Sequence, residues 1–311
     1  MYRTTDERFG LSECRSCGVF FLDPPPAPKD LPRYYPESFW RGDDRADDGR
    51  ADLRGRLTEW YRRLILRDHA RFVGTIIEEQ KRSGSWRGLL DIGCGDGSTL
   101  AIFDCEPGVG LDGSAAAVRH AASRGLTAVR AVPDAIPFRP ASFSVVTMFH
   151  FLEHVRPVAP HLASVRRLLC DGGELVVQVP NAESWGAGLL GRRWHGFDPP
   201  RHLVNYNSAA VRRTLEEQGF RVMSENHFCL RDNPATLATS VAPGLYPPAR
   251  AARGLEGEGA SALAGDLAYL ALTLAAIPFA LLESAAGRGE SVMLRCRVRD
   301  RAGDRDHGLG R

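Results

Sequence analysis

A short apolar run that ends in closely spaced glycines is the feature of this sequence with the clearest chemical use. Leu89–Ile92 has the composition of a buried strand, and Gly93, Gly95 and Gly97 follow it at every second position. Glycine lacks a Cβ atom, so such a turn can bend sharply and let a ligand approach the main chain. The spacing differs from the G-x-G-x-x-G pattern that holds a dinucleotide pyrophosphate. We therefore expect a ligand-binding turn between a strand and a helix.

An acidic residue closes the next strand-like run. Gly108–Leu111 is followed by Asp112, which places a carboxylate at the tip of that strand. A carboxylate there can accept hydrogen bonds from the two hydroxyls of an adenosine ribose. Ser114 is a suitable N-cap for the alanine-rich segment after it, and Gly125 ends that segment. The alternative interpretation is a strand-end acid that only caps the next helix.

Three histidines could accept a proton near neutral pH. His150 and His154 flank the end of the apolar run 142–148, where we expect a strand of the same sheet, and His202 lies in the sequence DPPRHL at 198–203. Each is a candidate general base. The alternative is a satisfied structural histidine, which is the commoner role for a single histidine.

Strands and helices alternate along the middle of the chain. Between residues 86 and 228, apolar runs of strand length are separated by segments with helical spacing. This alternation favours a doubly wound α/β fold with a mostly parallel sheet and right-handed crossovers. Residues 52–80 place apolar side chains at helical spacing, so one or two amphipathic helices should precede the sheet. A helix at 208–218 and a sixth strand at 221–228 should follow the fifth strand, which ends at Pro180.

These motifs and their order resemble the class I S-adenosylmethionine-dependent methyltransferases. The segments at 136–138 (IPF), 151–155 (FLEHV) and 168–177 (LLCDGGELVV) are similar to segments of that family. The resemblance covers residues 2–228 and a last strand at 291–298. It implies a seven-stranded, mostly parallel Rossmann-like methyltransferase sheet, with an N-terminal arm and a helical insertion before the last strand. The DPPRHL loop matches the group with an N-terminal Cys pair, which is related to small-molecule and sugar C- and O-methyltransferases.

The resemblance implies S-adenosylmethionine as the cofactor and assigns residues to it. Asp91 is expected near the methionyl part, Asp112 on the ribose hydroxyls, and the turn itself along the cofactor through Gly93, Cys94, Gly95 and Gly97. His150, at the end of the fourth core strand, is expected to contact the cofactor as well.

Two positions depart from the family pattern. Val132 and Pro133 stand where an Asp-Ala pair usually meets the adenine, so Asp134 is the expected substitute. Ser144 stands where an acid is usual.

The catalytic base is expected among the three histidines. A histidine placed like His202 acts as the base in sugar C-methyltransferases, so His202 is the first candidate, with His150 and His154 as alternatives. Trp185, Trp194 and Arg201 precede or adjoin His202 in the sequence and could shape the site for the methyl acceptor.

The N-terminal arm, residues 1–50, carries a single pair of closely spaced cysteines, Cys14 and Cys17. A structural zinc site needs four ligands, and this pair supplies two, so we expect a metal-free remnant. The sequence predicts no metal site elsewhere. Residues 34–40 (YYPESFW) either pack an arm onto the core or form a wall or lid over the ligand.

Composition limits the classes of partner. The chain has 311 residues, 43% hydrophobic and 25% charged, with a net charge of +2 and only two lysines, Lys29 and Lys81. Its arginines are interspersed with acids, which argues against a nucleic-acid partner. The first residues are polar, and the seven cysteines do not form a secreted disulfide framework, so we expect a cytoplasmic protein.

The expected domains are the arm, a methyltransferase core at 51–229, a helical insertion at 230–289, and a last strand with a charged, disordered tail at 290–311. Within the insertion, Leu267–Leu282 is uncharged and contains Pro278. It is shorter than the ~20 residues that span a bilayer, so a buried or lid helix is expected. A dimer face, a wall for an apolar acceptor and a membrane-surface contact are the alternatives. The oligomeric state is not predicted.

We expect a methyltransferase that acts on oxygen or carbon of a small-molecule acceptor, which could be hydrophobic. A nicotinamide-dependent oxidoreductase is the alternative enzyme, but Gly97 comes one residue too early for it. The third hypothesis is a module that binds S-adenosylmethionine without turnover, which the lone Cys pair and Val132 keep open.

Overall fold

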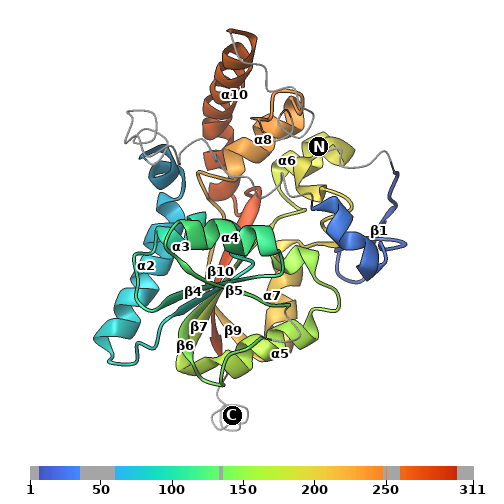
Figure 1. Cartoon of the computed structure of the whole chain (residues 1–311). Coiled ribbons are helices and arrows are strands. Elements are labelled where there is room, and N and C mark those ends of the chain that lie inside the picture. The colour runs from blue at the N-terminus through green and yellow to red at the C-terminus, as the bar shows by residue number, and fades with distance from the viewer. Residues whose placement is uncertain (1–6, 36–59, 133–135, 248–249, 251–259, 300–311) are drawn as a thin grey trace, which may run out of the picture.

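A seven-stranded sheet in the order β5-β4-β3-β6-β7-β10-β9 forms the centre of the molecule (Figure 1). The structure is a computed structural model that describes residues 7–35, 60–132, 136–247, 250 and 260–299. The strands of this sheet are β3 Leu89–Ile92, β4 Gly108–Asp112, β5 Thr127–Arg130, β6 Phe143–Phe149, β7 Leu169–Pro180, β9 Phe220–Asn226 and β10 Ser291–Val298. The predicted fold is confirmed.

The sheet is parallel except at its last strand. β3 pairs in parallel with β4 and β6, β4 with β5, and β6 with β7. β10 is antiparallel to both of its neighbours, β7 and β9. The carboxyl ends of the parallel strands therefore meet at one edge, where ligands bind in open α/β sheets.

Helices cover both faces because successive strand residues point to opposite sides. Leu89 packs with apolar residues of α2 and α3, whereas Leu90 packs with those of α5 and α7. The helices of the core are α2 Arg67–Arg82, α3 Ser98–Ala101, α4 Ala115–Ser123, α5 Ala159–Leu168 and α7 Ser208–Glu217. Ser114 caps α4, with its side chain accepting from the N–H of Ala117, as the sequence predicts.

Short elements at the carboxyl edge connect the core strands. They are the 3-10 helices η5 Leu152–His154, η6 Gly191–Arg193 and η7 His195–Phe197, and the helix α6 Trp185–Leu190. All of them follow β6 or β7.

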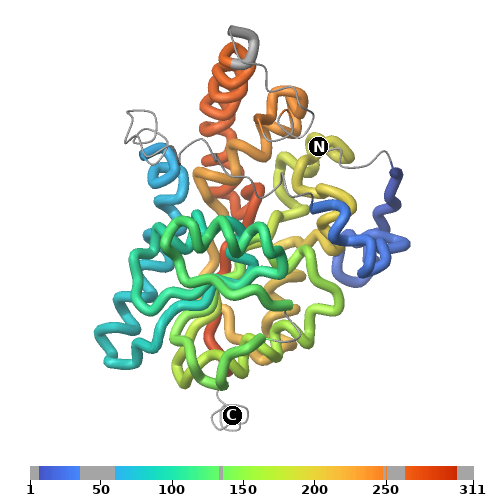
Figure 2. Tube along the Cα trace, viewed as in Figure 1, coloured from blue at the N-terminus to red at the C-terminus, as the bar shows by residue number. Residues whose placement is uncertain are grey.

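The N-terminal arm joins the core through a second, small sheet. Its strands β1 Leu11–Glu13 and β2 Phe20–Leu22 pair with β8 Val204–Asn205, and the 3-10 helix η1 Pro28–Tyr34 follows. The arm thus lies against the chain directly after His202 (Figure 2). Residues 36–40 of the aromatic segment and the expected domain boundary at residue 50 lie outside the described residues.

The described part of the insertion between β9 and β10 contains the helices α8 Asn233–Val241 and α10 Ala260–Ala285. They lie side by side and project away from the sheet (Figure 1). The expectation of a buried helix is wrong for much of α10, because Leu267 and Leu282 are 56% and 63% exposed.

The helix is also longer than the uncharged run. Leu263–Ala285 has 23 residues and a mean hydropathy of 1.8, so by length and composition it is long and apolar enough to cross a membrane. The charged residues that seemed to bound it lie inside the helix: Asp266 pairs with Arg250, and Glu283 is buried.

Candidate cofactor and catalytic site

The glycine turn after β3 is held against β4. The backbone N–H groups of Gly93 and Cys94 both donate to the carbonyl of Leu111, at 2.8 and 3.1 Å. Gly93 has φ +78°, in the left-handed region that glycine tolerates. A Cβ atom there would lie 2.6 Å from Cδ2 of Phe151. The turn therefore presents bare main chain directly beside the segment that carries the predicted histidines.

Asp112 lies at the end of β4, as predicted, and is 7% exposed. Its Oδ2 accepts a hydrogen bond from the N–H of Gly95 at 3.1 Å, and its Oδ1 accepts one from the N–H of Ser114 at 2.7 Å. A carboxylate has about four acceptor positions, so two remain for ribose hydroxyls. The two interpretations of Asp112 are thus compatible, since one carboxylate can cap the helix and bind a ligand.

Asp91 is buried inside the sheet at the end of β3. Burial raises the pKa of its carboxyl to about 7, although the Thr147 hydroxyl donates to Oδ1 at 2.7 Å and opposes that rise. An ammonium group nearby favours the ionised form of such a carboxyl. The site therefore fits the amino group of a methionyl ligand, the part of the cofactor that the family resemblance implies for Asp91.

The other predicted cofactor residues differ in what they can contribute. The thiol of Cys94 points to β4, because a Cβ atom on Gly110 would meet its Sγ at 2.6 Å. Only the main chain of Cys94 is left to face a ligand. Asp134 and Pro133 lie outside the described residues. Ser144, where the family has an acid, accepts from the N–H of Arg87 and donates to the carbonyl of Ser85, so it fixes the start of β6.

The structure brings the three predicted histidines together around Glu153, which the sequence did not single out. Glu153 is fully buried. Its Oε1 lies 3.3 Å from Nδ1 of His150 and 3.9 Å from Nε2 of His202. The rings of His154 and His202 are 4.8 Å apart at a steep angle. The sequence feature that could have indicated this cluster is the position of Glu153 between His150 and His154.

A second carboxylate that the sequence did not single out, Asp232, reaches the cluster from the insertion. Its Oδ2 lies 3.2 Å from Nε2 of His150. Burial opposes protonation of His150, but Asp232 and Glu153 outweigh it and raise the pKa of the imidazole to about 9. Burial lowers the pKa of His154 to about 4 and also lowers the pKa of His202.

Hydrogen bonds fix the orientation of the two neutral imidazoles. Nδ1 of His202 lies 2.7 Å from the carbonyl of Gly196, and Nδ1 of His154 lies 2.9 Å from the carbonyl of Arg201. A carbonyl can only accept, so the proton of each ring is on Nδ1 and the lone pair is on Nε2. The arm contributes Tyr35, whose hydroxyl is 3.0 Å from Nδ1 of His154.

The residues expected around an acceptor separate into two groups. Trp194 is fully buried and donates from Nε1 to Glu290, so it belongs to the core and cannot line an acceptor site. Arg201 is buried and pairs with Asp198 within the DPPRHL loop. Trp185 is 43% exposed and packs against Phe279 of α10.

A protein-family model described as a methyltransferase domain matches residues 57–225, more than half of the chain. The chain belongs to this methyltransferase-domain family. For this domain, the predicted enzyme class and the predicted cofactor, S-adenosylmethionine, are confirmed. The nicotinamide-dependent and non-catalytic hypotheses gain no support from it.

Several known proteins are similar to this chain. An uncharacterized protein of Mycobacterium tuberculosis is 33% identical over 150 residues, 48% of this chain and 51% of the relative. A probable S-adenosylmethionine-dependent methyltransferase of Mycolicibacterium smegmatis is 30% identical over 149 residues, 44% of this chain and 52% of the relative. The chain spans about half the length of these curated relatives. A solved methyltransferase structure from Archaeoglobus fulgidus has a TM-score of 0.48 and 16% identity, covering 79% of this chain and 99% of that one.

Proposed function

We propose that the whole protein transfers the methyl group of S-adenosylmethionine to an oxygen or carbon atom of a small-molecule acceptor. The cofactor supplies a methyl group that is already activated by its sulfonium, so the protein has mainly to align the reactants and exclude water. The observation that carries the proposal is the contact between the cofactor turn and the histidine cluster. Phe151 packs on Gly93, and His154 follows three residues later.

The cluster offers the acceptor two unprotonated nitrogens. Nε2 of His154 and Nε2 of His202 keep their lone pairs because Nδ1 of each ring faces a carbonyl. Such a lone pair can take a proton from the acceptor, as expected of His202, or bind a metal ion. Proton removal and metal binding would each help to activate an acceptor that reacts through a weakly acidic hydroxyl or an activated carbon.

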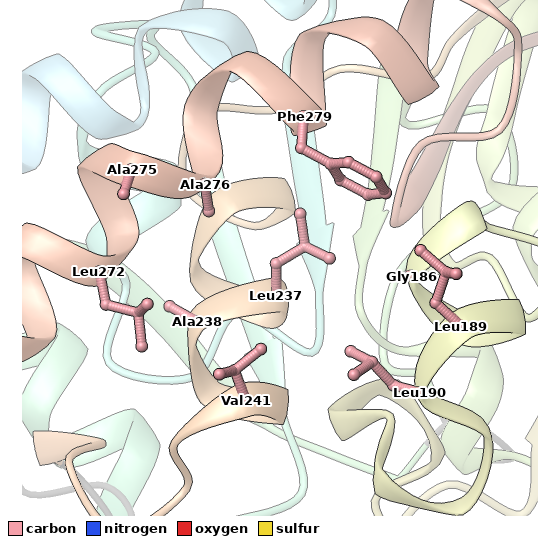
Figure 3. A pocket seen from close by; sticks show the side chains of 10 residues that line it. All are labelled: Gly186, Leu189, Leu190, Leu237, Ala238, Val241, Leu272, Ala275, Ala276 and Phe279. Atoms are coloured by element: carbon pink, nitrogen blue, oxygen red, sulfur yellow. The ribbon is translucent and has the colours of Figure 1, made fainter.

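We also propose that the acceptor has an apolar part. An apolar groove of about 290 Å³ lies between α6, α8 and α10 (Figure 3). Leu190, Leu237 and Phe279 point into it from these three helices. α8 starts directly after Asp232, which contacts His150, and its nine residues extend about 14 Å. The groove therefore begins no farther than the length of one short helix from Glu153 and the three histidines, which we call the reactive cluster.

The experiment is methyl transfer from isotopically labelled S-adenosylmethionine to cell extracts separated into aqueous, organic-soluble, protein and nucleic-acid fractions. Label should enter an organic-soluble small molecule. Transfer only to protein or nucleic acid would overturn the proposal, and transfer only to polar metabolites would overturn the apolar part. Val241→Glu, which adds a charge at the groove, should raise the KM for the acceptor and leave affinity for the cofactor unchanged.

A further inference from the structure

Three ligand-type side chains converge beside the methyl-transfer site. One oxygen of Glu153 and one nitrogen each of His154 and His202 all lie within 4.8 Å of one another. We propose that these three residues bind a divalent transition-metal ion. Two ligands of one ion, each about 2.1 Å from it, lie roughly 3–4 Å apart. The 3.9 Å between Nε2 of His202 and Oε1 of Glu153 falls in that range.

The histidines are oriented as metal ligands. A histidine that binds a metal through one nitrogen usually donates its other N–H to a carbonyl or carboxylate, which fixes the ring and its tautomer. His202 does so to Gly196, and His154 does so to Arg201. Nε2 is therefore the nitrogen that each ring has left for an ion, and Nε2 of His202 lies 3.9 Å from Oε1 of Glu153.

Glu153 supplies the negative charge that the ion would balance. The residue is fully buried, and neither carboxylate oxygen accepts a well-aligned hydrogen bond from a described residue. His150 is near one oxygen only, at 3.3 Å. A buried carboxylate oxygen without a partner is costly, and a divalent cation would satisfy Oε2, which His150 does not reach. This buried oxygen without a hydrogen-bond partner among the described residues is the observation, independent of the histidines, that indicates a cation.

A second cluster of similar residues nearby is explained without metal. His69, Cys229 and Asp232 also lie close together. Nε2 of His69, however, is 2.6 Å from the side-chain oxygen of Gln178, whose amide donates to Asp232 at 2.8 Å. Arg231 pairs with the same carboxylate. These groups satisfy one another, so the cation is assigned to Glu153 and not to this network.

The donor set points to the class of metal. Two imidazoles and one carboxylate, without a thiolate, suit Zn²⁺, Fe²⁺, Co²⁺ or Mn²⁺ and leave coordination positions open. We infer that an open coordination position of the ion binds an oxygen atom of the acceptor, and this inference rests on the proposed function. The acceptor would then carry a hydroxyl or enol oxygen at or next to the methylated atom. A bound ion would occupy the Nε2 lone pair of His202. His202 would then activate the acceptor through the ion and not by taking its proton.

The test is metal binding by the full-length protein after chelator dialysis. Zn²⁺, Mn²⁺ and Co²⁺ are each titrated alone by calorimetry, and Co²⁺ is also followed by its visible absorption. One ion per chain should bind, and Glu153→Gln and His202→Gln should each weaken binding at least tenfold. His154→Gln provides a third variant if one of these fails to fold, which circular dichroism reports. Cys14→Ser with Cys17→Ser, and His120→Gln on α4, should bind as the wild type does.

Two results would overturn the site. One is no saturable binding by the folded wild type. The other is binding that persists in the Glu153 and His202 variants but disappears with the cysteines. Failure of the proposed function has a different signature, because the metal-loaded protein would then bind one ion and transfer no label to any small molecule.

Discussion

Nε2 of His150 lies 3.2 Å from Oδ2 of Asp232, and this contact ties the end of β6 to the start of the helical insertion. The two residues are far apart in the sequence, yet they meet where the methyl group should be presented. Asp232 directly precedes α8, and Leu237, Ala238 and Val241 of that helix line the apolar groove. A change at the groove can therefore be transmitted to the reactive cluster through a single short helix.

His202→Ala should lower the turnover rate by roughly 10²–10⁴-fold. The variant loses the Nε2 lone pair, whether it takes a proton or binds an ion. Affinity for S-adenosylmethionine should barely change, because the glycine turn and Asp112 are expected to hold the cofactor. Steady-state kinetics and calorimetry measure the two effects. His150→Ala is the comparison: a collapse of turnover there, with near-normal turnover in His202→Ala, would transfer the main role to the end of β6.

Asp112→Ala should weaken binding of S-adenosylmethionine at least about tenfold. If Asp112 binds the ribose as predicted, the change removes two charge-assisted hydrogen bonds, each about 1.5–3 kcal/mol before compensation. Calorimetric titration checks the affinity. The exposed Asp171→Ala is the control and should bind like the wild type. Since Asp112 also accepts from Gly95 and Ser114, the melting temperature of the variant must show that it is folded. Unchanged affinity in the folded variant would refute the assignment.

Gly93→Ala should destabilise the protein more than Gly125→Ala, and only Gly93→Ala should also reduce cofactor binding. Both glycines have φ +78°, so both variants carry the backbone strain of about 1 kcal/mol. A Cβ atom on Gly125 meets nothing within 4 Å, whereas one on Gly93 lies 2.6 Å from the ring of Phe151. Urea unfolding measures the difference in the free energy of unfolding. Equal losses in the two variants would mean that Phe151 moves freely away.

Glu283→Gln should stabilise the protein increasingly as the pH rises from about 4.5 to about 8. Burial, with repulsion from Glu290, raises the pKa of Glu283 to about 8, above its value of about 4.5 in an unfolded chain. Such a carboxyl stabilises the fold when protonated, and this contribution is lost as the pH rises through about 8. Glutamine does not titrate, so the difference in melting temperature between variant and wild type should grow with pH. The exposed Glu217→Gln should show a constant difference, and a constant difference for Glu283→Gln would contradict the shift.

The elements of the core could be predicted because their signals are local. Ser114 and Gly125 bound α4 through capping and left-handed geometry, which neighbouring residues determine. Strand Gly108–Asp112 likewise follows from its apolar run and terminal acid. Gly93 and Asp112, the predicted cofactor contacts, could be placed at strand ends for the same reason.

The reactive cluster could not be predicted in full because it depends on distant segments. Nothing around Glu153 in the sequence shows that its carboxylate is buried, nor that Asp232 meets His150. The side-chain direction of Cys94 depends on the backbone conformation after β3, and this conformation directs the thiol toward Gly110. The exposure of α10 was missed because an apolar helix has the same composition whether protein, lipid or water surrounds it.

The order of strands in space differs from the order in which they are synthesised. β10, the last strand of the described chain, lies between β7 and β9 rather than at an edge of the sheet. Until residues 291–298 leave the ribosome, β7 and β9 both present unpaired backbone edges, and the edge of β7 includes the apolar residues Leu175–Val177, which are buried in the finished sheet. Open edges of this kind promote aggregation. A nascent chain that stops before Ser291 should therefore need a chaperone or precipitate, and the sheet should close only after the whole insertion has been made.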